Sequence, residues 1–297
     1  MKFIMRIDDV GYTHIHNLGS FEAIDRGIAT SADVMMDCPG TVEALEFLRE
    51  RPWISVGWHT HFWGSPVLPT EQVPSLIVEE AGRIRFRKDI VFSQEVVYEE
   101  IYAEAKAQIE RCIRILGRAP DTGSGHMDTP FGNALKAVSR EYGMKLGYEK
   151  TAKYGPPNFF QRGEDGPDAF IYMINPEAGL NMMRYDTVKE ALAYEPLRYF
   201  TEDPSHILDY GDDEVVMFAL HPGNVDYFME FQGDYGPGAP YYLLTRPIDT
   251  HCLCSEALRA WVRENNVELV NFHDALYGTR QYQVHLKHIG SDLYKGI

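Results

Sequence analysis

The chain has 297 residues, 44% of them hydrophobic, which suits one large α/β domain or two small ones, with a substantial core. Its formal net charge of −16, from 28 basic and 44 acidic side chains, repels phosphate backbones and anionic lipids, so we expect neither nucleic acid nor membrane partners. The N-terminus leads straight into a strand pattern and no apolar run reaches 18 residues, which predicts a cytoplasmic protein.

Short apolar runs alternate along the chain with amphipathic helical patterns. The runs typical of buried strands are Phe3–Ile7, Ala32–Met36, Ile54–Trp58, Lys145–Tyr148, Val215–Leu220 and Glu268–Phe272. The helical patterns cover approximately Asn17–Arg26, Thr41–Arg51, Gln94–Leu116, Phe131–Tyr142, Val188–Tyr194 and Ser255–Asn265. We expect Ser93 to cap the longest helix and Gly117 to end it. The alternation predicts a parallel sheet with crossover helices, in a single-domain distorted (β/α) barrel of TIM-like layout.

Two segments, at about 150–213 and 224–250, interrupt this alternation. The first is rich in Pro, Gly and Asp, with a short helix at most, and the second contains six aromatic residues. We expect both to be irregular insertions within one domain that spans 1–297, since no repeat or linker divides the chain. Whether the six aromatic rings stack on a substrate or pack in the core is open.

The four cysteines are expected to be reduced core residues. Cys252 and Cys254 form a Cys-x-Cys pair, but no second pair and no His-x-x-x-His accompanies them, as a zinc site would require.

Four polar motifs follow the predicted strands or helices. They are Asp8-Asp9-Val10-Gly11, His59-Thr60-His61, Asp121-Thr122-Gly123-Ser124-Gly125-His126 and His221-Pro222-Gly223. Each alone has a structural alternative, such as a turn, a helix cap or a buried histidine. Because the carboxyl ends of parallel strands face the active site in such folds, we expect the four motifs to share one face.

Together these motifs have the composition of a metal-dependent hydrolase. One Asp and two His are a typical ligand set for a catalytic divalent ion with open positions for water. A second Asp can then act as a base on water, and a histidine can protonate a leaving amine.

The sequence resembles the YdjC-like carbohydrate deacetylases, a family that includes chito-oligosaccharide and hopanoid-sugar deacetylases, over nearly its whole length. The motifs that carry the resemblance, in order, are Asp8-Asp9-Val10-Gly11, Asn17, Glu22-Ala23-Ile24-Asp25-Arg26-Gly27, Thr30-Ser31, Gly57-Trp58-His59, Leu220-His221-Pro222-Gly223 and the segment from Arg246 to Val267-Glu268-Leu269-Val270. The third site departs from the family pattern. The family's Asp-Ser-His-x-His is replaced by a stretch with one histidine, His126, so contacts to the sugar must differ there.

The resemblance implies a role for each motif residue. Asp9, His59 and His126 would bind one divalent metal ion, Asp8 would be the base and His221 the acid. The remaining site candidates, expected to support the ligands or contact substrate, are His61, Arg246, Asp128 and Trp63. We expect His61 to support the metal ligands rather than bind the metal.

The expected reaction is removal of an acetyl group from an N-acetylated sugar or short oligosaccharide. The ligand types favour zinc, whereas magnesium is often assigned in the resembling family. One alternative is a metal-dependent sugar or sugar-phosphate isomerase or epimerase, although only Arg6 and Arg246 lie near the motifs to bind a phosphate. A second is a non-catalytic sugar-binding protein, which the presence of all the motif residues disfavours. The oligomeric state is open, and a homo-oligomer is common for enzymes of this size.

Overall fold

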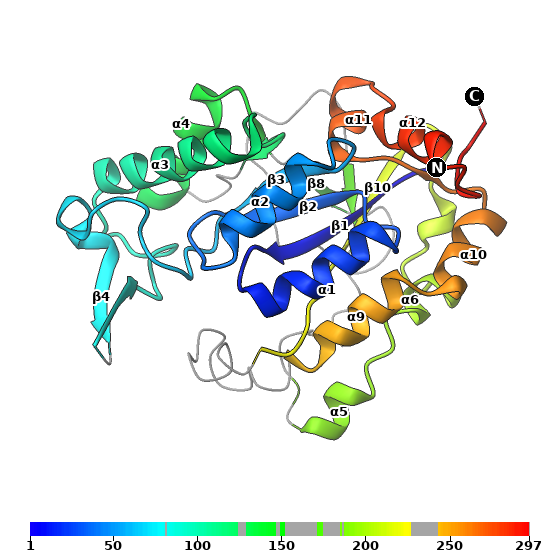
Figure 1. Cartoon of the computed structure of the whole chain (residues 1–297), viewed down its shortest axis with the longest axis horizontal. Helices are drawn as coiled ribbons and strands as arrows, with labels where there is room; N and C mark the ends of the chain where they lie inside the picture. Colours follow the sequence, from blue (N-terminus) through cyan, green and yellow to red (C-terminus); the bar gives the residue numbers. More distant parts are fainter. Residues whose placement is uncertain are drawn as a thin grey trace.

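A parallel sheet runs through the centre of the computed structural model, with helices packed around it (Figure 1). The structure describes residues 1–80, 82–123, 129–146, 149–151, 171–174, 185, 187–226 and 243–296. The strands of the sheet in these ranges are β1 (Lys2–Val10), β2 (Ser31–Met35), β3 (Ser55–His59), β6 (Thr122–Gly123), β7 (Lys145–Leu146), β8 (Glu149–Thr151), β9 (Ile171–Met173), β10 (Val215–Leu220) and β11 (Glu268–Leu269). Their order is β7-β6-β3-β2-β1-β10-β9-β8, and β11 pairs with the start of β1.

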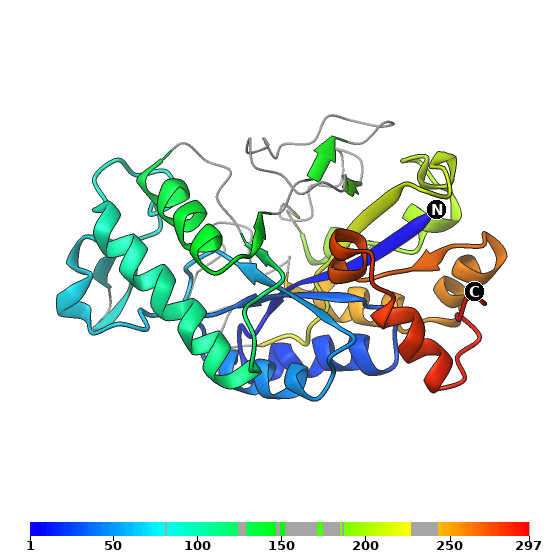
Figure 2. The same cartoon turned by 90° about the horizontal axis from the view of Figure 1, so that it is seen from above.

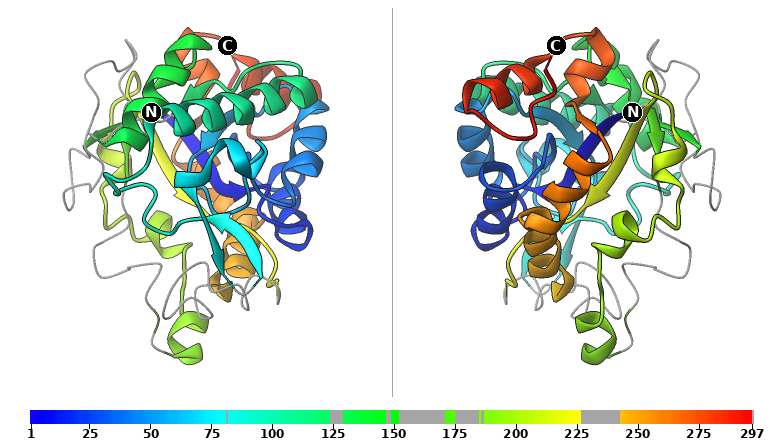
Figure 3. Two further views of the ribbon diagram at one scale, coloured as in Figure 1. Left: turned by 90° about the vertical axis from the view of Figure 1, so that its left-hand side faces the viewer. Right: turned by 90° about the vertical axis from the view of Figure 1, so that its right-hand side faces the viewer.

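The sheet curls strongly. Its two ends are β7, which stops at Leu146, and β8, which starts at Glu149. Three peptide links span at most about 11 Å, so the chain itself brings the two ends of the sheet close together. Helices cover the outside of the curled sheet, as the views from above and from the two sides show (Figures 2 and 3). The predicted α/β fold with a distorted barrel is therefore confirmed.

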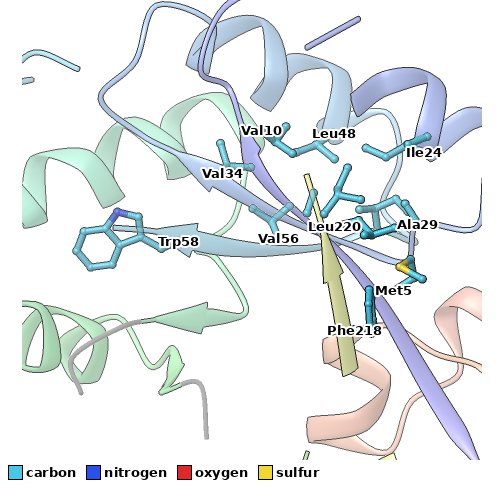
Figure 4. Close-up of a cluster of buried hydrophobic side chains, with 14 of the residues drawn as sticks. Met5, Val10, Ile24, Ala29, Val34, Leu48, Val56, Trp58, Phe218 and Leu220 are labelled. Atoms are coloured by element: carbon cyan, nitrogen blue, oxygen red, sulfur yellow. The ribbon is translucent and has the colours of Figure 1, made fainter. Parts of the chain in front are cut away.

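The central strands are apolar because they are covered on both faces. All residues of β2 and β10 are buried, as expected for parallel strands between layers. Figure 4 shows Val10, Val34 and Val56 of three neighbouring strands near Leu48 of helix α2 (Thr41–Arg49) and Ile24 of helix α1 (His14–Asp25). This apolar layer fixes the strands whose ends carry the polar motifs.

The other elements surround this core. The helices are α3 (Tyr98–Leu116), α4 (Pro130–Glu141), α5 (Val188–Leu192), α6 (Arg198–Thr201), α9 (Thr245–Leu253), α10 (Glu256–Glu264), α11 (Phe272–Tyr277) and α12 (Gln281–His288). Three 3₁₀ turns (Thr70–Gln72, Pro74–Leu76 and Ile207–Asp209) and an antiparallel hairpin of β4 (Ile77–Glu80) and β5 (Arg83–Phe86) complete the described elements. None of the helices in the described ranges is long and apolar enough to cross a membrane.

Gly117 ends α3 as predicted, in a left-handed conformation with φ of 88°, but Ser93 does not cap it. The helix begins five residues later, because its start is held by a distant segment. Val97 N–H donates to the Ser75 hydroxyl (2.9 Å), and Ser75 N–H donates to the Glu100 carboxylate (2.8 Å). The start of α3 is thus fixed by contacts with Ser75, which lies 22 residues or more away in the sequence. A search for a local capping residue cannot predict such a start.

Both predicted insertions contain regular structure, and one strand prediction is too long. The first segment contributes β9, which pairs with β10, together with α5 and α6. The second ends inside α9, which starts at Thr245. The strand predicted to reach Phe272 stops at Leu269, because Asn271 caps α11 with a reciprocal bond to Asp274. The six aromatic residues between Tyr227 and Tyr242 lie outside the described residues.

Candidate metal and catalytic site

Three strands, β1, β3 and β10, bring three of the four polar motifs to one end of the sheet. Asp8 and Asp9 lie near the end of β1, and β1 has β10 on one side and β2, then β3, on the other. His59 is the last residue of β3, and His221 directly follows β10. Because these strands are parallel, their carboxyl ends meet at the same edge of the sheet, as the sequence predicted.

A backbone distortion turns both carboxylates of β1 into this site. Neighbouring residues of a regular strand point to opposite faces, so an unbroken strand would present only one of the pair. The register of β1 against β2 shifts between Ile7 and Val10, and Asp9 has a φ of +61°. Such a conformation typically costs about 1–3 kcal/mol outside glycine. Strain at this position therefore brings Asp8 and Asp9 together.

Asp9 is buried and held by three cationic or imidazole groups. One oxygen, Oδ1, lies 2.9 Å from His59 Nε2 and 3.9 Å from His61 Nε2. The other, Oδ2, accepts a hydrogen bond of 2.6 Å from Arg246. Burial by itself raises the pKa of Asp9, but the Arg246 charge and the His59 bond outweigh it and hold the pKa well below its ordinary value. Asp9 is therefore a carboxylate at neutral pH.

Asp8 forms a second charged group with Arg6 and His221. Arg6 Nε lies 2.7 Å from Asp8 Oδ1, and Arg6 Nη2 donates to Asp8 Oδ2 at 3.0 Å. Oδ2 is also 3.7 Å from His221 Nε2. Burial raises the pKa of Asp8, but the charges of Arg6, His59 and His221 more than offset this and lower it. Asp8 is thus an ionised acceptor next to an imidazole.

The histidines differ in charge. For His59, burial disfavours the charged ring, yet the bond to Asp9 and the charges of Asp8 and Asp9 raise its pKa. Burial lowers the pKa of His221 to about 4, and burial together with the nearby His59 charge lowers that of His61 to about 3. Two neutral imidazoles and one that pairs with Asp9 therefore surround the carboxylates at neutral pH.

Asp9, His59 and His61 have the donors and the spacing of a divalent-metal site. One ligand atom from each lies within 4.8 Å of the other two. Donors on a tetrahedral ion at 2.0–2.1 Å are separated by about 3.3 Å, which the 2.9 and 3.9 Å distances bracket. A second group, Asp8, Asp33 and His59, also gathers, but both oxygens of Asp8 lie within 3.0 Å of the Arg6 guanidinium. Asp9 turns only Oδ2 to Arg246 and keeps Oδ1 toward the histidines. The first group is therefore the better fit to a cation.

The other predicted site residues have mixed outcomes. Trp63 is partly exposed and stacks on His61, with ring centroids 4.2 Å apart and planes at 14°. Arg246 is fully buried and contacts Asp9 and the His221 carbonyl. His126 and Asp128 lie outside the described residues. The described strand before them, β6, pairs with β3 at Gly57.

Two buried carboxylates near the site were missed by the sequence interpretation. Asp249 accepts the backbone N–H of His221 at 2.9 Å, and burial raises its pKa to about 6. Asp33 lies between Arg6 and His59. The signal for Asp33 was present, since it is a carboxylate between the apolar residues Ala32 and Val34 of a buried strand, Ser31-Ala32-Asp33-Val34-Met35. Asp249 follows Arg246 by less than one helical turn and had no distinguishing pattern.

Comparison with known proteins gives carbohydrate deacetylases as relatives, two of them matching over nearly the whole chain. "Carbohydrate deacetylase" of Enterococcus faecalis is 28% identical over 283 residues, covering 91% of this chain and 97% of that protein. "Carbohydrate deacetylase 2" of Listeria innocua is 24% identical over 280 residues, covering 92% of this chain and 98% of that protein. A carbohydrate deacetylase of Brevibacillus brevis is 40% identical over 114 residues, 38% of this chain and 44% of that protein.

The fold has a solved counterpart. A proposed cellobiose-phosphate cleavage protein from Enterococcus faecalis V583 superimposes with a TM-score of 0.63 at 24% identity, covering 92% of this chain and 98% of that one. The model of the YdjC-like protein family matches residues 2–264. That match covers most of the chain and includes the Asp-Asp, His59 and His221 motifs, and the chain therefore belongs to the YdjC-like protein family.

Proposed function

We propose that this chain is a metal-dependent hydrolase that removes the acetyl group from an N-acetylated sugar or short oligosaccharide. The observation that carries the proposal is the division of one buried site into two halves. Asp9, His59 and His61 present metal-type donors, and Asp8 and His221 stand 3.7 Å apart beside them. The names of the relatives, carbohydrate deacetylases, support the substrate class.

We further propose that Asp9 and His59 bind the ion together with His126, as the family resemblance implies. His61 Nε2 lies close enough to Asp9 to be a ligand as well. The mixed nitrogen and oxygen donors favour zinc over magnesium, which prefers oxygen ligands alone. An ion held there supplies Lewis-acid chemistry, polarising the acetamide carbonyl and making water a stronger acid.

The chain's own residues would move the protons. Asp8 is held ionised and oriented by Arg6, so it can accept a proton from water as the water oxygen bonds to the carbonyl carbon. His221 is neutral at rest, because burial lowers its pKa to about 4, and it becomes an acid only after it gains a proton. Asp8 Oδ2 and His221 Nε2 are 3.7 Å apart, which is longer than a hydrogen bond, so the proton would pass to His221 once a side-chain shift of about 0.5–1 Å brings the two atoms into contact. His221 then protonates the sugar nitrogen as the C–N bond breaks, which yields acetate and a free amine.

The geometry is less suited to the isomerase alternative. Arg6 and Arg246, the two cations expected near the motifs, both face buried carboxylates, at 2.7 Å and 2.6 Å. Neither therefore presents a guanidinium toward a phosphate of the substrate. A hydrolase of uncharged acetylated sugars needs no such group.

Acetate release tests the proposal. The purified protein is stripped with a chelator, reloaded with zinc, magnesium, manganese or cobalt, and incubated with short N-acetylglucosamine oligomers. We expect metal-dependent acetate, and none from Asp8→Asn, which should still bind the ion. Asp37→Asn is a matched control, because Asp37 is also buried but accepts a hydrogen bond from Gly64. Substantial acetate from Asp8→Asn would refute the base assignment, and no acetate with any metal would refute the reaction.

The third ligand can be assigned with two further variants. Zinc affinity should fall far more in His126→Ala than in His61→Ala if His126 is the ligand. The reverse order would give that role to His61, whose ring also lies 4.2 Å from that of His59.

A further inference from the structure

Asp33 is a buried carboxylate that the proposed reaction does not use. It lies in the middle of β2, is 8% exposed, and has apolar neighbours along the strand, Ala32 and Val34. A carboxylate is expensive to bury unless charged or hydrogen-bonding groups face it. Its presence at this position therefore calls for a specific partner.

The Asp33 side chain reaches the site from the side opposite Asp9. Its Oδ2 lies 3.7 Å from Arg6 Nη1 and 3.8 Å from His59 Nδ1. The other ring nitrogen of His59, Nε2, is the one that faces Asp9 at 2.9 Å. The His59 ring is therefore placed between two carboxylates, one at each nitrogen.

The neighbouring strand leaves room for this arrangement at Gly57. Asp33 pairs directly with Gly57, and His59 follows two residues later on the same face. A Cβ atom at position 57 would lie 2.0 Å from Asp33 Oδ1, inside any permitted contact. Only glycine at this position allows the carboxylate to lie across β3 toward the His59 ring.

We propose that Asp33 is a positioning residue, which holds the Nδ1 side of His59 so that Nε2 faces Asp9 and the metal position. At 3.8 Å the Asp33 carboxylate makes no direct hydrogen bond, but it attracts a proton to Nδ1 of His59 and so favours the ring form whose Nε2 lone pair is left for a cation. Arg6 lies next to both Asp33 and Asp8, so Asp33 also helps to position the guanidinium that faces Asp8. Asp33 thus connects the two halves of the site. This inference builds on the metal site of the proposed function, but it requires no particular substrate.

Zinc affinity and the His59 ring signals test the inference without any turnover. Zinc dissociation constants are measured by competition with a chromophoric chelator for the wild type and for Asp33→Ala, Asp33→Asn and Gly57→Ala. Loss of such a partner typically weakens metal binding about 10- to 100-fold, which we expect for Asp33→Ala and Gly57→Ala. Asp33→Asn keeps an acceptor oxygen and should lose less. In ¹⁵N spectra of the zinc-loaded protein, the His59 Nδ1–H signal should shift or vanish in Asp33→Ala.

Asp37→Asn is the matched control, since Asp37 is another buried carboxylate that follows β2 but bonds to Gly64. It should leave the zinc affinity and the His59 signal unchanged. Thermal unfolding of every variant separates a fold defect from a local one. Zinc binding equal to wild type in Asp33→Ala would overturn the inference, even if the enzyme is active. Zinc binding that depends on Asp33 in a protein that releases no acetate would support it and refute only the proposed reaction.

Discussion

The buried pair of Arg246 and Asp9 offers a sharp test of the site's electrostatics. The two side chains are 0% and 2% exposed, and the charged atoms lie 2.6 Å apart. With an effective dielectric constant of about 20, the attraction at this distance is about 6 kcal/mol before the cost of burial. Replacing Arg246 by Met keeps the apolar stem but leaves Asp9 with the His59 bond alone. Removing one partner of a buried ion pair typically lowers the free energy of unfolding by about 3–5 kcal/mol. Because Asp9 keeps its bond to His59, we expect a loss at the lower end, about 3 kcal/mol.

A double-mutant cycle measures this value. Urea unfolding of the metal-free protein is followed by circular dichroism for the wild type, Arg246→Met, Asp9→Asn and the double variant. Because the loss comes from the unpaired Asp9 charge, the double variant should be clearly more stable than the sum of the single losses implies. A loss below about 1 kcal/mol in Arg246→Met, or strict additivity, would show that Asp9 does not depend on Arg246 for its charge.

Three further predictions concern other parts of the molecule. Burial raises the pKa of Asp37 to about 6, so the folded protein holds a proton there that the unfolded chain has lost, and stability should fall by up to about 3 kcal/mol as the pH rises from 4 to 6. Asp37→Asn should remove that part of the slope in urea midpoints measured across this range, and an unchanged slope would contradict it. Trp63 stacks on His61 at the edge of the site, where its ring can also contact a sugar. Trp63→Ala should therefore raise the KM for acetylated oligomers about 2- to 10-fold, with a smaller change in kcat. An unchanged KM would place Trp63 outside the sugar site. Asn271→Ala should lose about 1–2 kcal/mol of unfolding free energy through its cap of α11, whereas Asn271→Ser should lose less, and equal losses would argue against the cap.

The central strands could be predicted because their sequence signal is local. Val215–Leu220 is a continuous apolar run, and the structure has a strand over the same residues. Such runs are typical of parallel strands covered on both faces, because every side chain of such a strand is buried and therefore apolar. Helix ends were less predictable, as Ser93 shows, because the start of α3 depends on Ser75 and Glu100, which come together only in the folded chain.

The candidate site could be predicted in composition but not in its supporting contacts. Parallel strands place their carboxyl ends at one edge, so the Asp8-Asp9 pair, His59 and His221 were expected to lie together. In the structure His59 lies next to Asp9, and His221 lies next to Asp8. The roles of Arg246 and Asp33 depend on side chains that cross between elements. Arg246 reaches Asp9 from 237 residues away, and Asp33 reaches His59 only because residue 57 lacks a side chain.

The Asp8-Asp9 pair shows why this division between local and long-range information matters for chemistry. On a regular strand only one of two neighbouring carboxylates could enter the site, and two there would repel each other. The strand geometry is distorted at Asp9, where φ is positive. Each carboxylate then pairs with a different arginine, Asp8 with Arg6 and Asp9 with Arg246. Separate cations keep both groups ionised while leaving them different neighbours, His221 for Asp8 and His59 for Asp9. A base and a metal ligand thus arise from adjacent residues of the same type, because the backbone strain and the two arginines give them different surroundings.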